Sequence, residues 1–255
     1  MDAFRHSHSL GQNFLTDRNL LSAIVADAGV SPTDTVIEVG AGQGALTRQL
    51  AETGARVIAF EIDKRLEDYL RPLEARFPNL TVVFADFMKC DLAEFGADKF
   101  KAVANLPYYI TTPVLFRFLE QSECESVTVM VQKEVAERIV APAGGKDYGV
   151  LSVSAQLVGK PRITRTVGRQ MFTPPPNVDS AVVHIDVEQN RVDAQIAKVV
   201  RAAFAMRRKT LVNCLSSAGY DKTRINAAIA SLGLDASVRG EKLTPDQFVR
   251  LSGLL

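Results

Sequence analysis

The sequence predicts an α/β fold followed by a small all-helical part at the carboxyl end. Short apolar segments of strand length alternate with helical segments in the amino-terminal part of the chain. A glycine-rich turn joins the strand predicted at 35–39 to a helix that begins at Ala45. Helical periodicity then marks the last part of the sequence. It covers 194–204, 210–217, 222–231 and 245–251, with Gly219, Gly233 and Gly240 between these helices.

Composition is that of a globular protein with one or two domains. The chain has 255 residues, 47% of them hydrophobic and 23% charged, and a mean hydropathy of +0.04. No apolar run approaches the ~18 residues that span a bilayer, and the amino terminus has no apolar segment of signal-peptide length. The three cysteines form no C-x-x-C pair, which favours reduced thiols in the cytoplasm and argues against a zinc site. His6 and His8 are better explained by a solvated arm than by a metal pair.

The net charge of +1 conceals an uneven distribution. Residues 1–159 contain 15 Lys and Arg against 21 Asp and Glu, whereas residues 160–255 contain 15 against 8. A positive carboxyl-terminal part predicts a polyanionic partner. The alternative is a set of scattered solvated charges, and clustering argues against it. The clustered or closely spaced cations are Arg162, Arg165, Arg169, Arg201, Arg207, Arg208 and Lys209.

The amino-terminal segment is predicted to be an extended arm followed by a helix. The arm contains Gly-Gln-Asn-Phe-Leu at 11–15. Apolar residues with helical spacing follow at 20–25, and Asp17 is a suitable N-cap. Gly29 and Pro32 then end the helix.

Four predicted strands are each followed by a glycine turn or a polar residue. The strands are 35–39, 56–60, 81–84 and 101–104, and the features that follow them are the turn 40–44, Glu61, Asp86 and Asn105. Open α/β sheets bind ligands at the carboxyl ends of their strands. The first strand, glycine turn and helix resemble the nucleotide-binding half of a Rossmann-like unit. Glu61 follows Gly40 by 21 residues, a spacing that suits hydrogen bonds to ribose hydroxyls, and Asp86 can accept from an adenine amino group.

The spacing within the glycine turn narrows the type of nucleotide. It reads G-x-G-x-G, which differs from the G-x-G-x-x-G of dinucleotide-binding proteins, and the chain has no P-loop motif. After the strand 101–104 comes Asn105-Leu106-Pro107-Tyr108. The amide oxygen of Asn105 and a backbone carbonyl can accept both hydrogens of an exocyclic amino group, while Tyr108 offers a face for stacking. Alone, this tetrapeptide is equally well explained by a proline-containing turn. Together, these motifs are typical of S-adenosylmethionine-dependent amino-methyltransferases.

Nine motifs in order resemble the KsgA/RsmA family, the small-subunit (16S) ribosomal RNA adenine N6-dimethyltransferases. They lie at 11–15, 38–44, 61–63, 85–86, 105–108, 131–138, 148–153, 172–180 and 201–209, and so cover the chain nearly from end to end. One departure is Tyr109, where bacterial members more often have Asn. We expect this difference to affect loop packing and not chemistry.

The resemblance implies a fold, a domain organisation and a set of site residues. The expected fold is a class I methyltransferase sheet of seven strands, with an antiparallel last strand at 181–187. The catalytic domain is expected at 1–187 and a helical RNA-contacting or ribosome-contacting domain at 188–255. The implied cofactor contacts are Asn13, Leu15, Gly40, Glu61, Asp86 and Asn105, and the implied catalytic residues are Asn105, Leu106, Pro107, Tyr108 and Phe172.

Tyr108 and Phe172 are expected to hold the target adenine between them. A core position is the alternative for Phe172. The proline run at 174–176 instead favours a rigid loop that exposes the ring in the pocket.

The activity implied by the resemblance is dimethylation of N6 on two adjacent adenosines in the 3′-terminal hairpin loop of 16S ribosomal RNA, with S-adenosylmethionine as methyl donor. The expected partner is this RNA within the small subunit or its precursor, with a role in ribosome assembly as an extension. We expect a cytoplasmic monomer that needs neither a metal nor a membrane. Two alternatives are a large-subunit ribosomal RNA adenine methylase and a non-catalytic nucleic-acid-binding assembly or transcription factor on the same fold.

Overall fold

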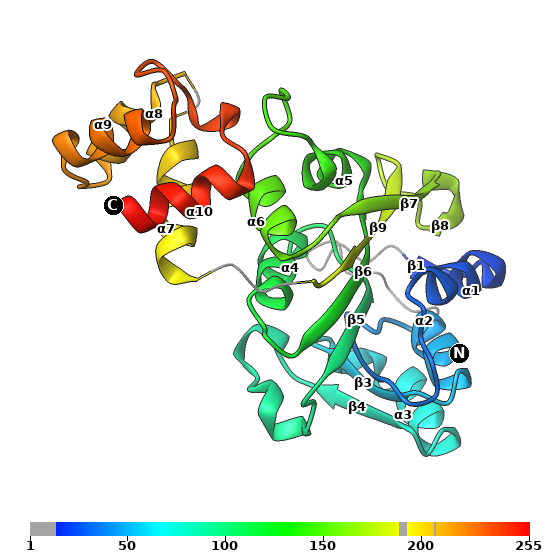
Figure 1. Cartoon of the computed structure of the whole chain (residues 1–255). Coiled ribbons are helices and arrows are strands. Elements are labelled where there is room, and N and C mark those ends of the chain that lie inside the picture. Colours follow the sequence, from blue (N-terminus) through cyan, green and yellow to red (C-terminus); the bar gives the residue numbers. More distant parts are fainter. Residues whose placement is uncertain (1–13, 189–192, 207) are drawn as a thin grey trace. The chain divides into compact units, whose positions relative to one another are not determined.

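The computed structural model describes residues 14–188, 193–206 and 208–255, which form two compact units (Figure 1). The first unit contains the described residues up to Ala136 together with Arg162–Val187. The second contains Glu137–Pro161 and the described residues from Glu188 to Leu255. Each unit has its own hydrophobic core. Asn13 and Arg207 lie outside the described residues.

A seven-stranded mixed sheet organises the first unit. Its strand order is β4-β3-β2-β5-β6-β9-β7, and all neighbours are parallel except β9, which is antiparallel to both β6 and β7. The strands are β2 (Thr35–Val39), β3 (Arg56–Glu61), β4 (Leu80–Phe84), β5 (Phe100–Asn105), β6 (Cys124–Gln132), β7 (Arg162–Val167) and β9 (Ser180–Asp186). The predicted α/β fold with seven strands and an antiparallel last strand is therefore confirmed.

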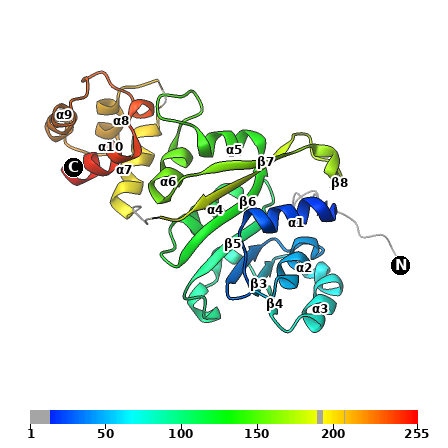
Figure 2. The ribbon, with the colours of Figure 1, turned by 45° about the vertical axis from the view of Figure 1, so that its right-hand side comes forward.

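The inner strands β2, β3, β5, β6 and β9 are buried on both faces, which explains why most of their residues are apolar. In β3, Val57 and Ala59 point into a core shared with α1 (Arg18–Asp27), α2 (Ala45–Glu52) and α3 (Glu67–Arg76). Figure 2 shows α2 and α3 beside β3 and β4. Phe60 points to the other face, because successive strand residues alternate. There its ring lies 5.3 Å from that of Phe87.

Phe87 in turn connects this second face to α4 (Thr111–Leu119). Its ring centroid lies 5.1 Å from that of Phe118, a fully buried residue of α4. Edge and tilted contacts between aromatic rings add to the stabilisation that burial provides. The short 3-10 turns of this unit are η2 (Lys64–Leu66), η3 (Phe87–Lys89), η4 (Leu92–Phe95) and η5 (Arg169–Met171).

A small antiparallel ladder joins two distant parts of the chain. Strand β1 (Phe14–Leu15) pairs with β8 (Phe172–Thr173), so that Leu15 lies opposite Phe172. Helix α1 follows β1 directly, and the Asp17 carboxylate accepts a hydrogen bond from Leu20 N–H at 2.8 Å, as predicted for its N-cap.

The second unit is built from helices around one core. Helix α5 (Lys133–Val140) leads the chain into it, and the other elements are α6 (Val150–Val158), α7 (Ala194–Phe204), α8 (Leu211–Ser217), α9 (Lys222–Ser231), η6 (Gly240–Lys242) and α10 (Pro245–Leu254). The helices after residue 193 lie where periodicity predicted them. No helix in the described part of the chain is long and apolar enough to cross a bilayer.

The helical unit begins earlier in the chain than the predicted boundary at residue 188. Helix α6 packs against α7 and α10, and its Val153 and Leu157 are buried in the core that these helices share. The Tyr148 hydroxyl, also within this core, donates to the Leu243 carbonyl at 3.0 Å. Residues 137–161 therefore belong to the helical unit, although the sequence assigned them to the first domain. Periodicity identifies such a helix but not the core that it enters.

A close approach of η6 to α7 generates a stability prediction. A Cβ atom added at Gly240 would lie 2.8 Å from the Ala203 carbonyl oxygen, closer than normal contact. We expect Gly240→Ala to lower the free energy of unfolding by about 1–3 kcal/mol, as overpacked sites do. Gly253→Ala in α10 is the control, because a Cβ there meets nothing within 4 Å. Urea unfolding followed by circular dichroism measures the stability of both variants. Equal stabilities of Gly240→Ala and wild type would contradict the prediction.

Candidate active site

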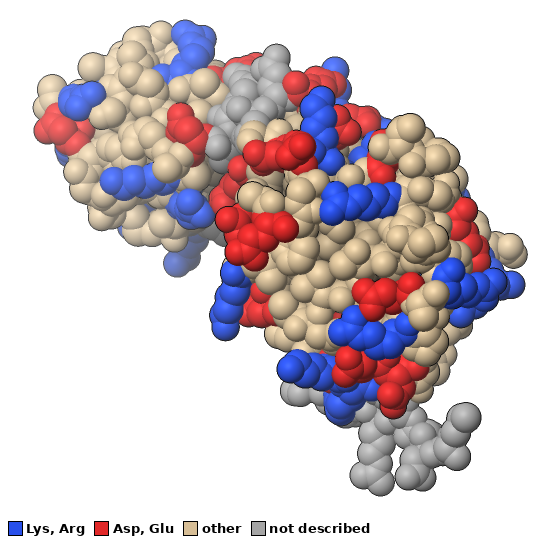
Figure 3. All heavy atoms as spheres, turned by 90° about the horizontal axis from the view of Figure 1, so that it is seen from below, with Lys and Arg blue, Asp and Glu red and all other residues tan. Residues whose placement is uncertain are grey.

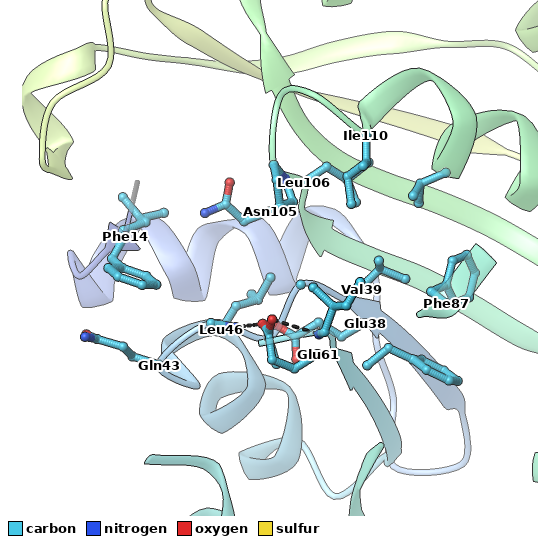
Figure 4. Close-up of a pocket in the computed structure, with 18 of the residues that line it drawn as sticks. Phe14, Glu38, Val39, Gln43, Leu46, Glu61, Phe87, Asn105, Leu106 and Ile110 are labelled. Carbon is cyan, nitrogen blue, oxygen red and sulfur yellow. Dashed lines mark hydrogen bonds between the residues drawn. The ribbon is translucent and has the colours of Figure 1, made fainter. Parts of the chain in front are cut away.

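A cavity of about 330 Å³ opens at the carboxyl ends of β2, β3, β4 and β5. Parallel strands place these ends at one edge of a sheet, so residues far apart in sequence meet there. Figure 4 shows side chains from several of these strand ends directed toward the same space. All of the predicted site residues in the described part of the chain line this cavity. They are Leu15, Gly40, Glu61, Asp86, Asn105, Leu106, Pro107, Tyr108 and Phe172.

The glycine turn forms the floor of the cavity because its backbone adopts conformations that side chains disfavour. Gly40 and Gly42 have φ angles of 79° and 58°. A Cβ at Gly40 would lie 3.1 Å from the Pro107 ring, and one at Gly42 would lie 3.1 Å from the Phe14 ring. Glycine thus lets the backbone border the cavity while Phe14 and Pro107 pack directly on it.

Glu61 is held in a fixed orientation by backbone donors. Its Oε2 accepts from Gly42 N–H at 2.8 Å, and its Oε1 accepts from Ile62 and Asp63 N–H at 2.9 Å each. Burial raises the pKa of Glu61, and these three hydrogen bonds oppose that rise by favouring the carboxylate. Figure 4 shows the Glu61 side chain, with dashed lines for hydrogen bonds to other residues that line the cavity. The end of β3 is thereby tied to the glycine turn after β2.

Glu38, on the neighbouring strand β2, was not among the predicted site residues. Its side chain is 1% exposed and lines the cavity, and its Oε2 has no hydrogen-bond partner among the described residues. Burial, with the nearby Glu61 carboxylate as a smaller cause, raises the pKa of Glu38 to about 8. The sequence signal was an acidic residue inside an apolar strand, where a charge is unfavourable unless a ligand or a partner offsets it.

Asp86 lies at the rim of the cavity beyond β4. Its Oδ1 accepts from Met88 N–H at 3.0 Å and so caps η3, and Lys89 Nζ lies 3.5 Å from Oδ2. The side chain is about one-third exposed, at 34%. The carboxylate therefore has a defined position and retains access to a ligand.

The Asn105–Tyr108 segment forms the opposite wall. Leu106 N–H donates to the Met130 carbonyl at 3.3 Å, which anchors the segment to β6. The described residues offer no hydrogen-bond partner to the Asn105 amide group or to the Leu106 carbonyl. The Tyr108 hydroxyl shares a hydrogen bond with Ser180 Oγ at 2.8 Å, which restrains the ring. Figure 4 shows the Asn105 amide directed into the cavity.

Phe172 lines the cavity, yet its ring is not exposed in the way that the sequence analysis expected. Only 3% of the residue is accessible, and it belongs to the hydrophobic core that contains Leu15. The β1–β8 ladder holds it there. Phe172 therefore borders the cavity, as predicted, and also occupies the core position that was the alternative. A role in holding the target adenine stays a prediction.

Tyr109 also differs from expectation. The sequence analysis assigned it to loop packing, but it lines the cavity and is 52% exposed. Ile62 and Met88, with exposures of 52% and 38%, line the same cavity and were likewise not predicted. Ile62 follows the predicted Glu61 by one position, and Met88 follows the predicted Asp86 by two. This proximity in sequence was the available signal for both residues.

Among the residues that the structure describes, no group of three or more His, Cys, Asp or Glu side chains is placed to hold a metal ion.

Comparison with known proteins identifies the family of this chain. Residues 3–255 match the sequence profile of ribosomal RNA adenine dimethylase. The chain belongs to the ribosomal RNA adenine dimethylase family.

Individual relatives resemble the chain over most of its length. A protein of Caldanaerobacter subterraneus named ribosomal RNA small subunit methyltransferase A is 41% identical over 255 residues, covering 96% of this chain and 95% of the relative. The structure of the 23S rRNA methyltransferase ErmE has a TM-score of 0.72 at 30% identity, covering 95% of this chain and 99% of its own. A dimethyladenosine transferase from Plasmodium falciparum has a TM-score of 0.80 at 26% identity, covering 93% and 95%.

As a member of the ribosomal RNA adenine dimethylase family, the protein is a methyltransferase that takes its methyl groups from S-adenosylmethionine. Three features of the cavity fit this cofactor. The glycine turn leaves room beside the backbone, the oriented Glu61 carboxylate can accept from hydroxyls, and the unpartnered Glu38 oxygen suits a positively charged group.

The buried Glu38 carboxyl makes stability depend on pH. Its pKa is about 8 in the folded protein against an ordinary value of 4.5. Between pH 4.5 and pH 8 the Glu38 carboxyl releases its proton in the unfolded chain but keeps it in the folded protein. The free energy of unfolding therefore falls as pH rises, by about 1.4 kcal/mol for each pH unit in this window. The loss is absent below pH 4.5 and levels off above pH 8. We therefore expect wild type to lose stability relative to Glu38→Gln across this window.

Chemical unfolding of wild type and Glu38→Gln at several pH values measures this difference. Glu52→Gln, a substitution at an exposed glutamate at the end of α2, is the control and should follow wild type. Parallel pH profiles for wild type and Glu38→Gln would show that the Glu38 carboxyl ionises normally in the folded protein.

Proposed function

We propose that the protein dimethylates N6 of two adjacent adenosines in the 3′-terminal hairpin loop of small-subunit (16S) ribosomal RNA. The observation that carries this proposal is the pair of acceptors at the cavity wall. Asn105 Oδ1 and the Leu106 carbonyl have no partner among the described residues, and they border the same cavity as Glu61 and the glycine turn. Two acceptors side by side suit an exocyclic amino group with two hydrogens. Relatives named small subunit methyltransferase A support the choice of RNA.

The acceptors address a chemical difficulty of the reaction. The amino nitrogen of adenine is a poor nucleophile because its lone pair is delocalised into the ring. Hydrogen bonds from both amino hydrogens to Asn105 and Leu106 favour a pyramidal nitrogen with a localised lone pair. As that nitrogen gains positive charge, the same carbonyl dipoles stabilise it. Catalysis then depends mainly on position and preorganised electrostatics, without a strong general base.

The neighbouring residues restrict the orientation of the target base. Pro107 limits the backbone after Leu106, and its carbonyl accepts from Ile110 N–H at 3.1 Å, which stabilises the turn. Tyr108 is held by Ser180 and can offer one ring face to the adenine. A base that enters this cavity must leave its stack, and stacking on an aromatic ring offsets part of that loss, about 1–3 kcal/mol per base. We propose that Phe172, which lies opposite Leu15 in the β1–β8 ladder, borders the other face of the target adenine.

The remaining site residues are proposed to hold the methyl donor. Bound S-adenosylmethionine supplies an electrophilic methyl group on a positively charged sulfur. Glu61 would accept from the ribose hydroxyls, Asp86 from the adenine amino group, and Leu15 and the Gly40 backbone would border the cofactor. We propose that Asn13, outside the described residues, contributes from the chain before β1, and that Asn105 borders both substrates.

Loss of the Asn105 amide is the direct test of this chemistry. We expect Asn105→Ala to lower the methylation rate by about 10²-fold or more, the usual effect of removing one preorganised polar group. Calorimetry should show that S-adenosylmethionine still binds. Asn213→Ala is the matched control, since Asn213 is exposed on α8 in the helical unit. Near-normal formation of dimethyladenosine by Asn105→Ala would refute the proposed role.

The cations available for RNA docking differ from those that the sequence suggested. Arg165 makes two hydrogen bonds to the Asp27 carboxylate, at 2.7 and 2.8 Å, and Arg162 lies 2.7 Å from Asp186. These two side chains are therefore already engaged in ion pairs. Figure 3 shows that Lys and Arg alternate with Asp and Glu on one face of the molecule. Of the other predicted cations in the described part of the chain, Arg169, Arg201, Arg208 and Lys209 are exposed. The adjacent Arg208 and Lys209 of the helical unit are the better candidates among them.

We propose that these two cations bind phosphates while the shape of the particle provides selectivity. The partner would be 16S ribosomal RNA within the small subunit or its precursor, with the protein acting in the cytoplasm as a monomer. Binding to an immature particle would also allow a role in subunit assembly. The match to ErmE supports a second candidate, methylation of large-subunit RNA, which the choice of substrate tests.

The substrate experiment offers an isolated hairpin, naked small-subunit RNA, large-subunit RNA and an immature small-subunit particle at several salt concentrations. We expect the particle to be methylated fastest. Replacing Arg208 and Lys209 by Ala should slow the reaction and reduce its salt dependence, because fewer phosphates are neutralised. Replacing Arg71 and Lys99, which are paired with Glu74 and Glu125, removes the same net charge as a control. Equal rates on hairpin and particle would refute recognition by shape, and preference for large-subunit RNA would favour the second candidate.

A further inference from the structure

Three exposed apolar side chains line the active-site cavity. Of the seven large apolar residues that are exposed in the described part of the chain, Ile62, Met88 and Tyr109 line this cavity. Scattered exposed apolar residues are ordinary on a protein surface, but exposed apolar residues that line a cavity indicate a ligand that covers them. No predicted role in the site accounts for these three residues.

The three residues arrive from different strand ends, and two of them accompany the carboxylates of the cofactor site. Ile62 directly follows Glu61 at the end of β3, and Met88 lies two residues after Asp86. Tyr109 reaches the same cavity from the segment after β5. Because Glu61 and Asp86 are proposed to bind ribose and adenine, the apolar group borders the adenosine half of the cofactor.

The surroundings of the Tyr109 hydroxyl also indicate that Tyr109 lies near Glu61 and Asp86. Partial burial raises the pKa of Tyr109, and the negative charges of Glu61 and Asp86 raise it further. The phenol is thus close enough to sense both carboxylates, and it stays protonated and able to donate a hydrogen bond. Tyr108 differs, since its hydroxyl is already bonded to Ser180 on β9.

We propose that Tyr109 is a cofactor-binding residue whose ring covers the adenosine half of S-adenosylmethionine, together with Ile62 and Met88. This inference rests on the proposed cofactor site and adds a residue to it. An aromatic ring can stack on adenine or pack on ribose, and its hydroxyl can donate to an adenosine acceptor. Two adjacent tyrosines would then serve different ligands, with Tyr108 on the RNA base and Tyr109 on the cofactor.

The assignment has a distinctive consequence for affinity. The adenosine half is identical in S-adenosylmethionine and in its product, S-adenosylhomocysteine. A contact to that half stabilises the substrate and product complexes equally, so it changes KM and product inhibition much more than kcat. A residue that acted on the methyl group or on the target base would instead change kcat.

Calorimetry with S-adenosylmethionine, S-adenosylhomocysteine and 5′-methylthioadenosine tests the proposal without relying on turnover. The last ligand keeps the adenosine and lacks the amino acid. We expect Tyr109→Ala and Tyr109→Asn to raise Kd for all three ligands by about tenfold or more, as loss of a base–aromatic stack does. Tyr109→Phe should keep most of the affinity. Tyr69→Ala is the control, because Tyr69 is a tyrosine of α3, 40% exposed, that is not among the residues lining the cavity.

Tyrosine emission provides a second measurement. The chain contains no tryptophan and five tyrosines, so its intrinsic fluorescence is that of tyrosine. Stacking of adenosine on Tyr109 should quench part of this emission, and Tyr109→Phe should lose that quenching while it still binds 5′-methylthioadenosine. The ligand-free variants should melt as wild type does, since the side chain is largely exposed.

Several outcomes would overturn the proposal. Unchanged Kd values in Tyr109→Ala, with tight binding by wild type, would refute the role of Tyr109 and leave the cofactor site intact. Weaker binding of S-adenosylmethionine with normal binding of 5′-methylthioadenosine would place Tyr109 near the amino-acid half instead. Failure of wild type to bind any of the three ligands would refute the cofactor site, and the present inference with it.

Discussion

The hydrogen bond between Gly42 N–H and the Glu61 carboxylate connects the parts on which the site depends. It joins the glycine turn after β2 to the last residue of β3, and two further N–H groups hold the same carboxylate. Parallel pairing brings these strand ends to one edge, but it does not orient a side chain. Three donors on one carboxylate do so, because each additional bond removes a rotational alternative. The floor of the cavity and its principal acceptor are thereby positioned together.

This arrangement places acidic groups where a globular core would normally exclude them. Glu38 and Glu61 are both nearly inaccessible, and burial raises the pKa of each. Such groups lower the stability of the ligand-free protein, and functional sites retain them because binding or chemistry requires them. The same surroundings favour a cation, since a positive charge in the cavity would be poorly screened from them. Stability is therefore reduced at the position where we propose that a positively charged methyl donor binds.

The β1–β8 ladder forms a further side of the cavity. Leu15 and Phe172 lie opposite each other in this pair and share one core, although they are far apart in sequence. A residue proposed for the cofactor and one proposed for the target base thus belong to the same small element. Tyr108, fixed by Ser180 on β9, continues this wall toward the sheet. Both substrates would meet a surface that is organised before either binds.

The sequence by itself determined the strands, their polar ends and the family. Alternating buried runs with a glycine turn specify parallel strands, and the geometry of such sheets brings Glu61, Asp86 and Asn105 to one edge. Tertiary structure decided what depends on neighbours distant in sequence. It buried Phe172 through β1, paired Arg165 with Asp27, placed residues 137–161 in the helical core, and brought Tyr109 and Glu38 to the cavity. Local patterns report which residues can form an element, whereas burial and ion pairing arise only when separate elements pack together.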